Sequence, residues 1–394
     1  MTTMARVSDV AEQIRGVTYD KTLASNEPSE GRFPILRAGN IRGEGLDFRD
    51  LVYLPKSSIS PKQLIKKGDV VIATSSGSLD VVGKAAQAEN DFQGGFGAFC
   101  KVLRPGPVVD PRYFGHFFRT PEYRSHVSRL AAGANINNLR MEHLGDLILP
   151  LPPIEDQRRI AKVLDQADEL LAKRRQTITL LDDLAQTIFL DMFGNPAINP
   201  KGWEIRTVGD LIESATYGSS QKAHMTGDFP VLRMGNLTAQ GRIDLSDLKY
   251  LPKSEVGERH IVRKGDVLFN RTNSADLVGK TAVFRESVPM AYAGYLVRVR
   301  ANPQNHPEYI SAFLNSGYGK KILRNMCKSI IGMANINARE LQSIRIPAAP
   351  LELQQEFARR LQATERQRAA HLSHLEALDE LFTSLQAKAF RGEL

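Results

Sequence analysis

The sequence FPILRAGNI fills residues 33–41, and a near copy, FPVLRMGNL, fills residues 229–237. About half of the 394-residue chain separates the two copies. Further pairs follow in the same order: YLPKS at 53–57 and 250–254, KKGDVV at 66–71 and RKGDVL at 263–268, VVGK at 81–84 and LVGK at 277–280, and ANIN at 134–137 and 334–337. A repeat of this length indicates a duplicated domain rather than the short units of a solenoid.

A long helix is predicted after each copy. The prolines in LPLPPIEDQ (149–157) and IPAAPLELQ (346–354) end one element and allow a helix to begin. Residues of a coiled-coil seam then recur at spacings of four and three. The predicted seam residues are Ile160, Leu164, Leu171, Arg174 and Leu181 in the first helix, and Phe357, Leu361, His371, Leu375, Leu378 and Phe382 in the second.

The connectivity predicts that the two helices are antiparallel. The first helix leads directly from the first block into the second, so a second helix that returns along it runs in the opposite direction. Arg174 and His371 fall at matching positions in mid-seam, where polar residues can fix the register. An approximate twofold axis is expected to relate the two halves.

The blocks themselves have the pattern of mixed helix and sheet. Short β-branched and aromatic runs predict strands, and two segments predict short helices at 111–130 and 307–326. The expected strands include Val70–Ile72, Phe99–Leu103, Val267–Phe269 and Tyr295–Val299. The predicted fold class is α/β (mixed α+β), with one domain at 1–150, a helical spacer at 151–195, a second domain at 196–347 and a second helix at 348–394.

Composition excludes several classes of protein. Apolar residues make up 42% of the chain and charged residues 24%, which is typical of a globular protein. No apolar run is long enough to cross a bilayer and the first residues lack a signal-peptide pattern, so a cytoplasmic protein is expected. Cys100 and Cys327 are too isolated to form a metal knuckle or a redox pair.

The distribution of charge points to an anionic partner. The net charge is +8, and it is concentrated in the two blocks: residues 1–153 carry +3 and residues 195–350 carry +8. The helical segments, 154–194 and 351–394, are slightly acidic at −2 and −1. Basic blocks suit phosphate contact, whereas acidic helices suit protein partners.

Motifs for catalysis are missing from the sequence. No Asn/Asp-Pro-Pro-aromatic motif and no glycine loop for S-adenosylmethionine is present, and Gly279-Lys280-Thr281 lacks the first glycine of a phosphate-binding loop. His371 and His374 have no acidic or cysteine companion at metal-ligand spacing. We therefore predict no catalytic residue, no bound metal and no cofactor on this chain.

These motifs together resemble the specificity subunit of type I restriction-modification systems. The resemblance covers nearly the whole chain and rests on GDVLFNRTNSADLVGK (265–280), the ANIN turns, LPLPPIEDQRRIAKVL (149–164) and LQAKAFRGEL (385–394). It implies two target-recognition domains that each read one half of a split double-stranded DNA sequence. It also implies two adenine methyltransferase subunits docked on the helices and, in a complete system, restriction/translocase subunits. S-adenosylmethionine, ATP and Mg²⁺ would then belong to the partners.

Comparing the two blocks separates the candidate DNA contacts by role. Residues that are the same in both blocks cannot distinguish two different half-sites, so they are predicted to contact the DNA backbone or support the scaffold: Arg37, Asn40, Lys84, Arg233, Asn236 and Lys280. Divergent polar loops are the base-reading candidates: Thr74, Ser75, Ser76 and Ser78, and Asn270, Arg271, Thr272, Asn273 and Ser274. A turn residue that bonds its own backbone is an equally good explanation for any one of them.

Two other functions remain open at this point. One is a stand-alone DNA-binding or interaction scaffold, and the other is a fused methyltransferase or nuclease, which the missing motifs disfavour.

Overall fold

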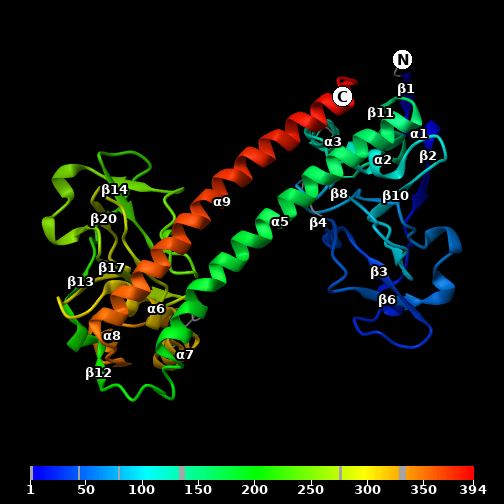
Figure 1. The fold of residues 1–394 in the computed structure, drawn as a ribbon. Helices are drawn as coiled ribbons and strands as arrows, with labels where there is room; N and C mark the ends of the chain where they lie inside the picture. The colour runs from blue at the N-terminus through cyan, green and yellow to red at the C-terminus, as the bar shows by residue number, and fades with distance from the viewer. Residues whose placement is uncertain (1–2, 43–44, 79, 133–137, 275–276, 328–333) are drawn as a thin grey trace. The chain divides into compact units, whose positions relative to one another are not determined.

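The computed structural model describes residues 3–42, 45–78, 80–132, 138–274, 277–327 and 334–394. The chain divides into two units (Figure 1). Unit 1 comprises residues 1–174 and 373–394, and unit 2 comprises residues 175–372. Each unit therefore contains one copy of the repeat and one half of each long helix.

A four-stranded antiparallel sheet forms the centre of unit 1, with strand order β2-β10-β7-β8. A smaller sheet of order β6-β3-β9 contains one parallel pair, β3 with β9, and β1 pairs with β11 immediately before the first long helix. The bounds of the strands are β1 Thr3–Arg6, β2 Ala11–Arg15, β3 Arg32–Leu36, β4 Ile41–Arg42, β5 Gly45–Leu46, β6 Val52–Pro55, β7 Val70–Ala73, β8 Ala85–Gln87, β9 Gly95–Phe96, β10 Cys100–Pro105 and β11 Ile148–Leu151. The helices are α1 Val7–Val10, α2 Pro111–Phe117, α3 Pro121–Ala132 and α4 Met141–Gly145.

Unit 2 repeats this topology. Its central sheet has the order β13-β21-β17-β19, its smaller sheet β15-β14-β20-β16 again contains a parallel pair, and β12 pairs with β23 before the second long helix. The strands are β12 Ile205–Thr207, β13 Ile212–Tyr217, β14 Phe229–Leu232, β15 Lys249–Leu251, β16 Ile261–Val262, β17 Val267–Asn270, β18 Thr272–Asn273, β19 Thr281–Val283, β20 Met290–Tyr292, β21 Leu296–Ala301, β22 Ala334–Asn335 and β23 Arg345–Pro347. The helices are α6 Pro307–Asn315, α7 Gly317–Met326 and α8 Ala338–Gln342.

The predicted long helices are confirmed as α5, Ile154–Phe193, and α9, Leu351–Arg391. Within unit 2, Phe357 near the start of α9 packs on Phe193 at the end of α5, and Arg368 further along α9 binds the earlier residue Asp182. Within unit 1, Arg159 near the start of α5 donates to the main-chain carbonyl of Leu394, at the end of the chain. The helices are therefore antiparallel in each unit.

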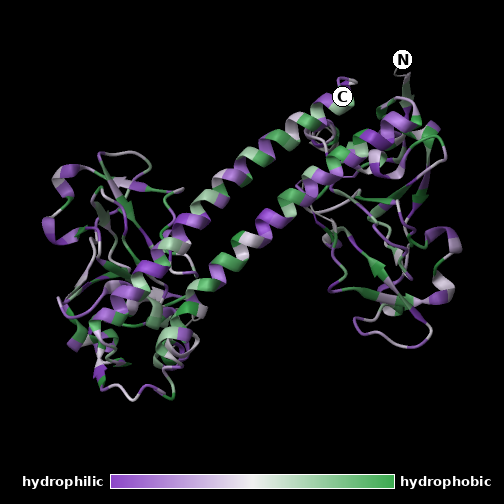
Figure 2. Cartoon of the chain, in the orientation of Figure 1, coloured by the Kyte–Doolittle hydropathy of each residue, from purple (hydrophilic) through white to green (hydrophobic). Residues whose placement is uncertain are grey.

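The predicted seam residues of these helices are shielded from solvent. Hydrophobic and hydrophilic residues alternate along both helices (Figure 2), and every predicted seam residue is buried or half-buried. Arg174 and His371 are both half-buried. The apolar side of each helix half thus closes against the rest of its own unit.

A buried glutamine fastens the first turn of each long helix. Gln157 of α5 accepts a hydrogen bond from the main-chain N–H of Asp110 at 2.8 Å and donates to the carbonyl of Pro152 at 2.8 Å. Gln354 of α9 accepts from the N–H of His306 at 2.7 Å and donates to Ala349. The glutamine that ends the repeated sequence IEDQ (154–157) or LELQ (351–354) therefore joins the start of each long helix to the residue that precedes α2 or α6 in the same unit.

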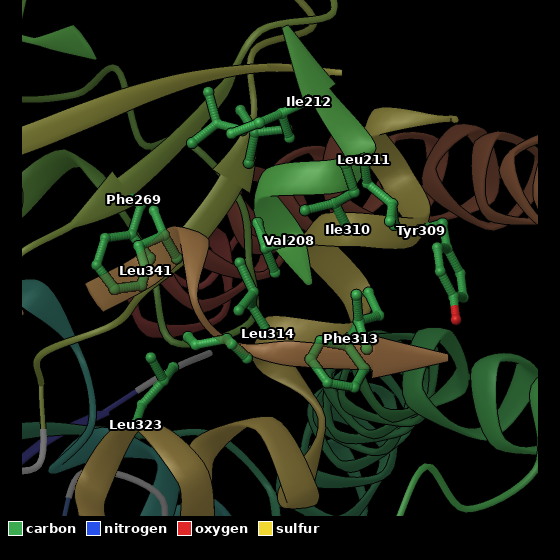
Figure 3. Close-up of a cluster of buried hydrophobic side chains, with 14 of the residues drawn as sticks. Val208, Leu211, Ile212, Phe269, Tyr309, Ile310, Phe313, Leu314, Leu323 and Leu341 are labelled. Atoms are coloured by element: carbon green, nitrogen blue, oxygen red, sulfur yellow. The ribbon is translucent and has the colours of Figure 1, made fainter. Parts of the chain in front are cut away.

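The main apolar core of unit 2 lies between its central sheet, α6, α7 and the long helices (Figure 3). Phe269 of the sheet and Phe313 of α6 are completely buried. Tyr309 is also buried in this core, and its hydroxyl donates to the carbonyl of Pro347 at 2.6 Å. Unit 1 has the same arrangement, in which the hydroxyl of Tyr113 donates to Pro150 at 2.9 Å.

Arg242 connects the domain of unit 2 to both long helices. Its guanidinium forms a two-pronged contact with Glu365 of α9, at 2.8–3.1 Å, and its Nη1 lies 2.8 Å from Asp182 of α5. The side chain of Arg242 is only 13% exposed, so this is a largely desolvated ion pair. Arg368 donates to the same Asp182 at 2.6 Å.

Replacing Arg242 by alanine should lower the free energy of unfolding of unit 2 by about 2 kcal/mol, because Glu365 would keep its charge without a partner in a half-buried place. Denaturation followed at Trp203, the single tryptophan of the chain, measures this, since Trp203 packs on Phe193 in unit 2. The matched variant Arg42→Ala removes an exposed guanidinium in unit 1, where Asp47 keeps its contact with Arg49, and should leave the Trp203 transition unchanged. Equal shifts for the two variants would contradict this role of Arg242.

Within the ranges described above, no helix has the length and apolar character needed to span a membrane. Those same residues form no group of three or more histidine, cysteine or acidic side chains that could hold a metal ion. Both cysteines, Cys100 and Cys327, are free thiols.

Candidate nucleic-acid interface

The two candidate reading loops leave the central sheet at matching places. In unit 1 the loop follows β7, and the N–H of Thr74 donates to Phe99 while its carbonyl accepts from Leu139. In unit 2 the loop follows β17, and the N–H of Arg271 donates to Tyr295 while its carbonyl accepts from Ile336. The same hydrogen-bond frame therefore holds two loops of different sequence.

The matching hydrogen bonds align the two repeats differently from the ANIN motifs in the sequence. Ile336 belongs to the second ANIN, and its structural counterpart in unit 1 is Leu139 rather than Ile136. The first ANIN, residues 134–137, lies outside the described residues. Asn138 forms an antiparallel β-bridge with Ser75 in unit 1, and Asn335 pairs with Thr272 in the same way in unit 2. The residues of unit 1 that match Asn335 and Ile336 in this frame are therefore Asn138 and Leu139, which corrects the pairing expected from the sequence.

The second ANIN turn supports the loop beside it. Ala334 and Asn335 form β22, which pairs with Thr272 and Asn273. Asn337 then caps α8, where its Oδ1 accepts from the N–H groups of Arg339 and Glu340, both at 2.9 Å. These bonds assign the turn a scaffold role in unit 2.

Two of the base-reading candidates lie inside the domain instead of on its surface. Thr74 is 1% exposed and its hydroxyl donates to the carbonyl of Phe99 at 3.1 Å. Asn270 is fully buried as the last residue of β17, and its amide donates to the carbonyl of Leu277. The expectation of base contact is revised for both, because each supports its loop from below.

The remaining loop candidates are accessible. Ser75 and Ser76 are half-buried and Ser78 is exposed, while Arg271, Thr272 and Asn273 are half-buried and Ser274 is exposed. Some of their polar atoms already have partners: the Oδ1 of Asn273 accepts from Ser274 within the loop, and Thr272 donates to Asn335 of β22 at 3.1 Å. The Arg271 guanidinium lies 4.9 Å from the centre of the Tyr217 ring, which orients it.

In unit 1 the loop and the repeated turn at residues 37–40 line a common hollow of about 550 Å³. Its lining residues are Arg37, Ala38, Gly39, Asn40, Arg42, Arg49, Asp50, Ser75, Ser76, Gly77 and Phe99. Arg42 and Arg49 both bind Asp47, at 2.8 and 2.9 Å. Since Arg37 and Asp50 also line the hollow, the charged side chains around it carry a small net positive charge. Of the candidates in block 1, the hollow brings together Arg37 and Asn40 with Ser75 and Ser76, whereas Lys84, Thr74 and Ser78 do not line it.

Asn40 and Asn236 hold the repeated turn in shape. Asn40 accepts from the N–H of Arg37 at 2.9 Å and donates to the carbonyls of Asp47 and Arg49. Asn236 makes the equivalent bonds in unit 2, and both asparagines are at least 95% buried. Their identity in the two blocks therefore reflects the architecture of the turn.

The two arginines beside these asparagines remain partly accessible. Arg37 donates to the carbonyl of Asp50 at 2.9 Å, and Arg233 donates to the carbonyl and the carboxylate of Asp247 at 2.9 and 2.7 Å. Each guanidinium is therefore held on the outer face of its turn, a position from which a phosphate could be contacted.

Lys84 and Lys280 close the loops through their main chains. The carbonyl of Lys84 accepts from Ala73, and that of Lys280 accepts from Asn270. A further cation, Lys320 of α7, was not singled out by sequence. It donates to Gly279 at 2.7 Å, and burial, with help from the charge of Lys280, lowers its pKa to about 8. In unit 1 the matching carbonyl, that of Gly83, accepts instead from the hydroxyl of Tyr123 at 3.0 Å.

Changing Asn270 to alanine should destabilise unit 2 by about 1–3 kcal/mol and leave the recognised sequence unchanged, because the residue is buried beneath the loop. Asn273→Ala, on the accessible part of the same loop, should leave stability nearly unchanged. Chemical denaturation and mapping of methylated DNA separate the two effects. An Asn270 variant that folds normally but reads a different sequence would contradict this assignment.

Comparisons with known proteins agree with this architecture. The type I restriction modification DNA specificity domain matches residues 2–180 and 200–377. The Escherichia coli K12 type I restriction enzyme EcoKI specificity subunit is 33% identical over 99% of this chain and 89% of its own length. The StySPI specificity subunit of Salmonella potsdam is 31% identical over 99% and 88%.

Solved structures share the fold. A chain from a study of complex assembly and conformational transition of the type I R-M system has a TM-score of 0.61 at 18% identity, covering 100% of this chain and 98% of that chain. The type I S subunit from M. genitalium has a TM-score of 0.56 at 14% identity, with 99% and 96% covered. Two matched domains and full-length relatives above 30% identity establish that this chain belongs to the family of type I restriction-modification DNA specificity subunits.

Proposed function

We propose that this chain reads a two-part DNA sequence, one part through each unit, as the non-catalytic specificity subunit of a type I restriction-modification complex. One observation carries the proposal. A single hydrogen-bond frame presents two different polar loops, residues 75–78 in unit 1 and 271–274 in unit 2. A duplicated frame with divergent contacts suits recognition of two different half-sites.

The charge of the two blocks supports DNA contact. Residues 195–350 carry a net charge of +8 and residues 1–153 carry +3, whereas both helical segments are slightly acidic. Arg37 and Arg233 lie on the outer faces of matching turns. Cations of this kind supply the salt-dependent phosphate contacts of DNA-binding proteins.

Exposed apolar residues on α5 support docking of protein partners. In unit 1, Val163 and Leu170 are 38% and 55% exposed and lie seven residues apart along α5, and Leu184 of the same helix, in unit 2, is 36% exposed. The pair in unit 1 forms an outer stripe that is distinct from the buried seam. Such a stripe favours a helical partner, and we assign it to the methyltransferase subunits, of which the duplicated chain would hold two.

The chemistry would then reside on the partners. S-adenosylmethionine would bind to the methyltransferase subunits, and ATP and Mg²⁺ to restriction/translocase subunits where the system includes them. The absence of a methyltransferase motif from the sequence supports this division of labour. The complex would act on DNA in the prokaryotic cytoplasm.

Labelled S-adenosylmethionine tests the proposal with purified components. The chain alone should bind duplex DNA and transfer no label, and addition of the methyltransferase subunits encoded with it should start transfer to adenine. Binding by the chain alone should weaken about a thousandfold between 50 and 200 mM salt if roughly six phosphates are contacted. Label transfer without a partner, or binding that is insensitive to salt, would contradict the proposal.

A further inference from the structure

Two exposed aromatic rings occupy matching places beside the reading loops. Phe99 is 67% exposed and Tyr295 is 53% exposed. The aromatic residue three positions earlier in each unit, Phe96 or Tyr292, is completely buried. The same segment therefore buries one ring and leaves the next in solvent.

A tight turn produces this exposure. The N–H of Cys100 donates to the carbonyl of Gly97 at 2.8 Å, and the N–H of Leu296 donates to that of Ala293 at 2.9 Å. Each exposed aromatic is thus the third residue of a four-residue turn and precedes the first residue of β10 or β21. The sequence pattern predicts both aromatics as the first residues of strands, and each strand begins one residue later.

The turns are bonded directly to the loops. The carbonyl of Phe99 accepts from the N–H groups of Thr74 and Ser75, at 2.8 and 3.2 Å. The carbonyl of Tyr295 accepts from the N–H of Arg271 at 3.0 Å. The backbone that carries each ring is therefore held beside the first residues of its reading loop.

The surroundings of Phe99 fit a nucleic acid. Phe99 lines the 550 Å³ hollow with Ser75, Ser76 and Arg37, so an apolar ring stands beside hydroxyl groups and a guanidinium. A single exposed aromatic on a protein surface needs no explanation. Two at matching positions, each bonded to a loop that faces solvent, indicate a shared use.

We propose that Phe99 and Tyr295 are specificity-determining residues that contact bases in the major groove, each in the half-site read by its own unit. This inference rests on the proposed function. The Phe99 ring has no hydrogen-bonding group, so it recognises a base by apolar contact, and the C5-methyl group of thymine is the apolar group of the major groove. Tyr295 adds a hydroxyl, which lets the second unit combine ring contact with a polar one.

Deoxyuridine substitution tests the role of Phe99. The complete methyltransferase complex is bound to a duplex that carries its mapped target, and each thymine of the first half-site is replaced in turn by deoxyuridine, which lacks only the methyl group. For the wild-type complex, one replacement should weaken binding about fourfold, the value expected for one buried methyl group. Phe99→Ala should bind the unmodified duplex more weakly and no longer distinguish thymine from deoxyuridine, and Phe99→Leu should keep part of the discrimination.

Phe48 provides the matched control. It is an exposed phenylalanine of the same unit, 49% accessible, which packs on Phe92 and does not line this hollow. Phe48→Ala should discriminate as the wild type does. Full discrimination by Phe99→Ala, or equal binding of every deoxyuridine duplex by the wild-type complex, would overturn the inference while site-specific binding still supports the proposed function. A wild-type complex without any preferred site on unmodified DNA would instead overturn the proposed function, and this inference with it.

Discussion

Replacing Phe357 by alanine should lower the free energy of unfolding of unit 2 by about 3–5 kcal/mol. Phe357 is completely buried, and its ring centre lies 5.9 Å from that of Phe189 and 5.4 Å from that of Phe193. The substitution would open a cavity where the start of α9 meets the end of α5. Because Trp203 packs on Phe193 at 5.9 Å, its fluorescence should report the loss as an earlier transition in denaturant.

Leu381→Ala is the matched control on the same helix. Leu381 is 52% exposed and belongs to unit 1, so the Trp203 transition should move by less than about 0.5 kcal/mol. If Phe357→Ala left the Trp203 transition unchanged, the contacts of Phe357 with Phe189 and Phe193 would not be what stabilises unit 2.

The long helices could be predicted because their signal is local. Prolines mark where each helix begins, and the seam residues repeat over many turns, so the pattern specifies the buried side without any tertiary information. The strand order could not be predicted, because the pairing of β10 with both β2 and β7 depends on contacts between distant segments.

The candidate site was only partly predictable, for reasons visible in particular residues. Divergence between the blocks selected two loops that follow matching strands, β7 and β17, but it did not show that Thr74 and Asn270 lie below the surface, since polar residues occur in either place. The sequence pattern places Phe99 and Tyr295 in strands because aromatic residues favour strands. The Gly97-Ala98 and Ala293-Gly294 pairs before them were the available signal for a turn.

The role of Arg242 could not be predicted from the sequence, for a different reason. Its partners, Asp182 and Glu365, lie on two helices that are far from it along the chain. The repeat comparison gave no help, because no shared motif contains this arginine. Tertiary ion pairs of this kind require coordinates.

Exchange of one whole block should have the largest effect on function. If residues 1–153 are replaced by the corresponding block of a relative, the sequence recognised through unit 1 should change completely while the other half-site stays the same. The boundary after Pro153 keeps the β1–β11 pair in one piece and leaves α5 intact. The donor should retain the arginines that match Arg112 and Arg119, which bind Asp165 and Asp168 of α5.

The variant Arg112→Ala/Arg119→Ala, without any exchange, is the control for damage at this junction. It removes both contacts with α5 and should reduce stability or methylation yield without altering the recognised bases. A changed half-site in this control would mean that the junction, rather than the loops, selects the sequence.

Mapping of methylated adenines in cells that express the exchanged chain with its methyltransferase partners tests the central claim most directly. Independent reading by two units predicts a hybrid target, in which one half-site is that of the donor and the other is unchanged. A target in which both half-sites change, or in which neither does, would contradict it.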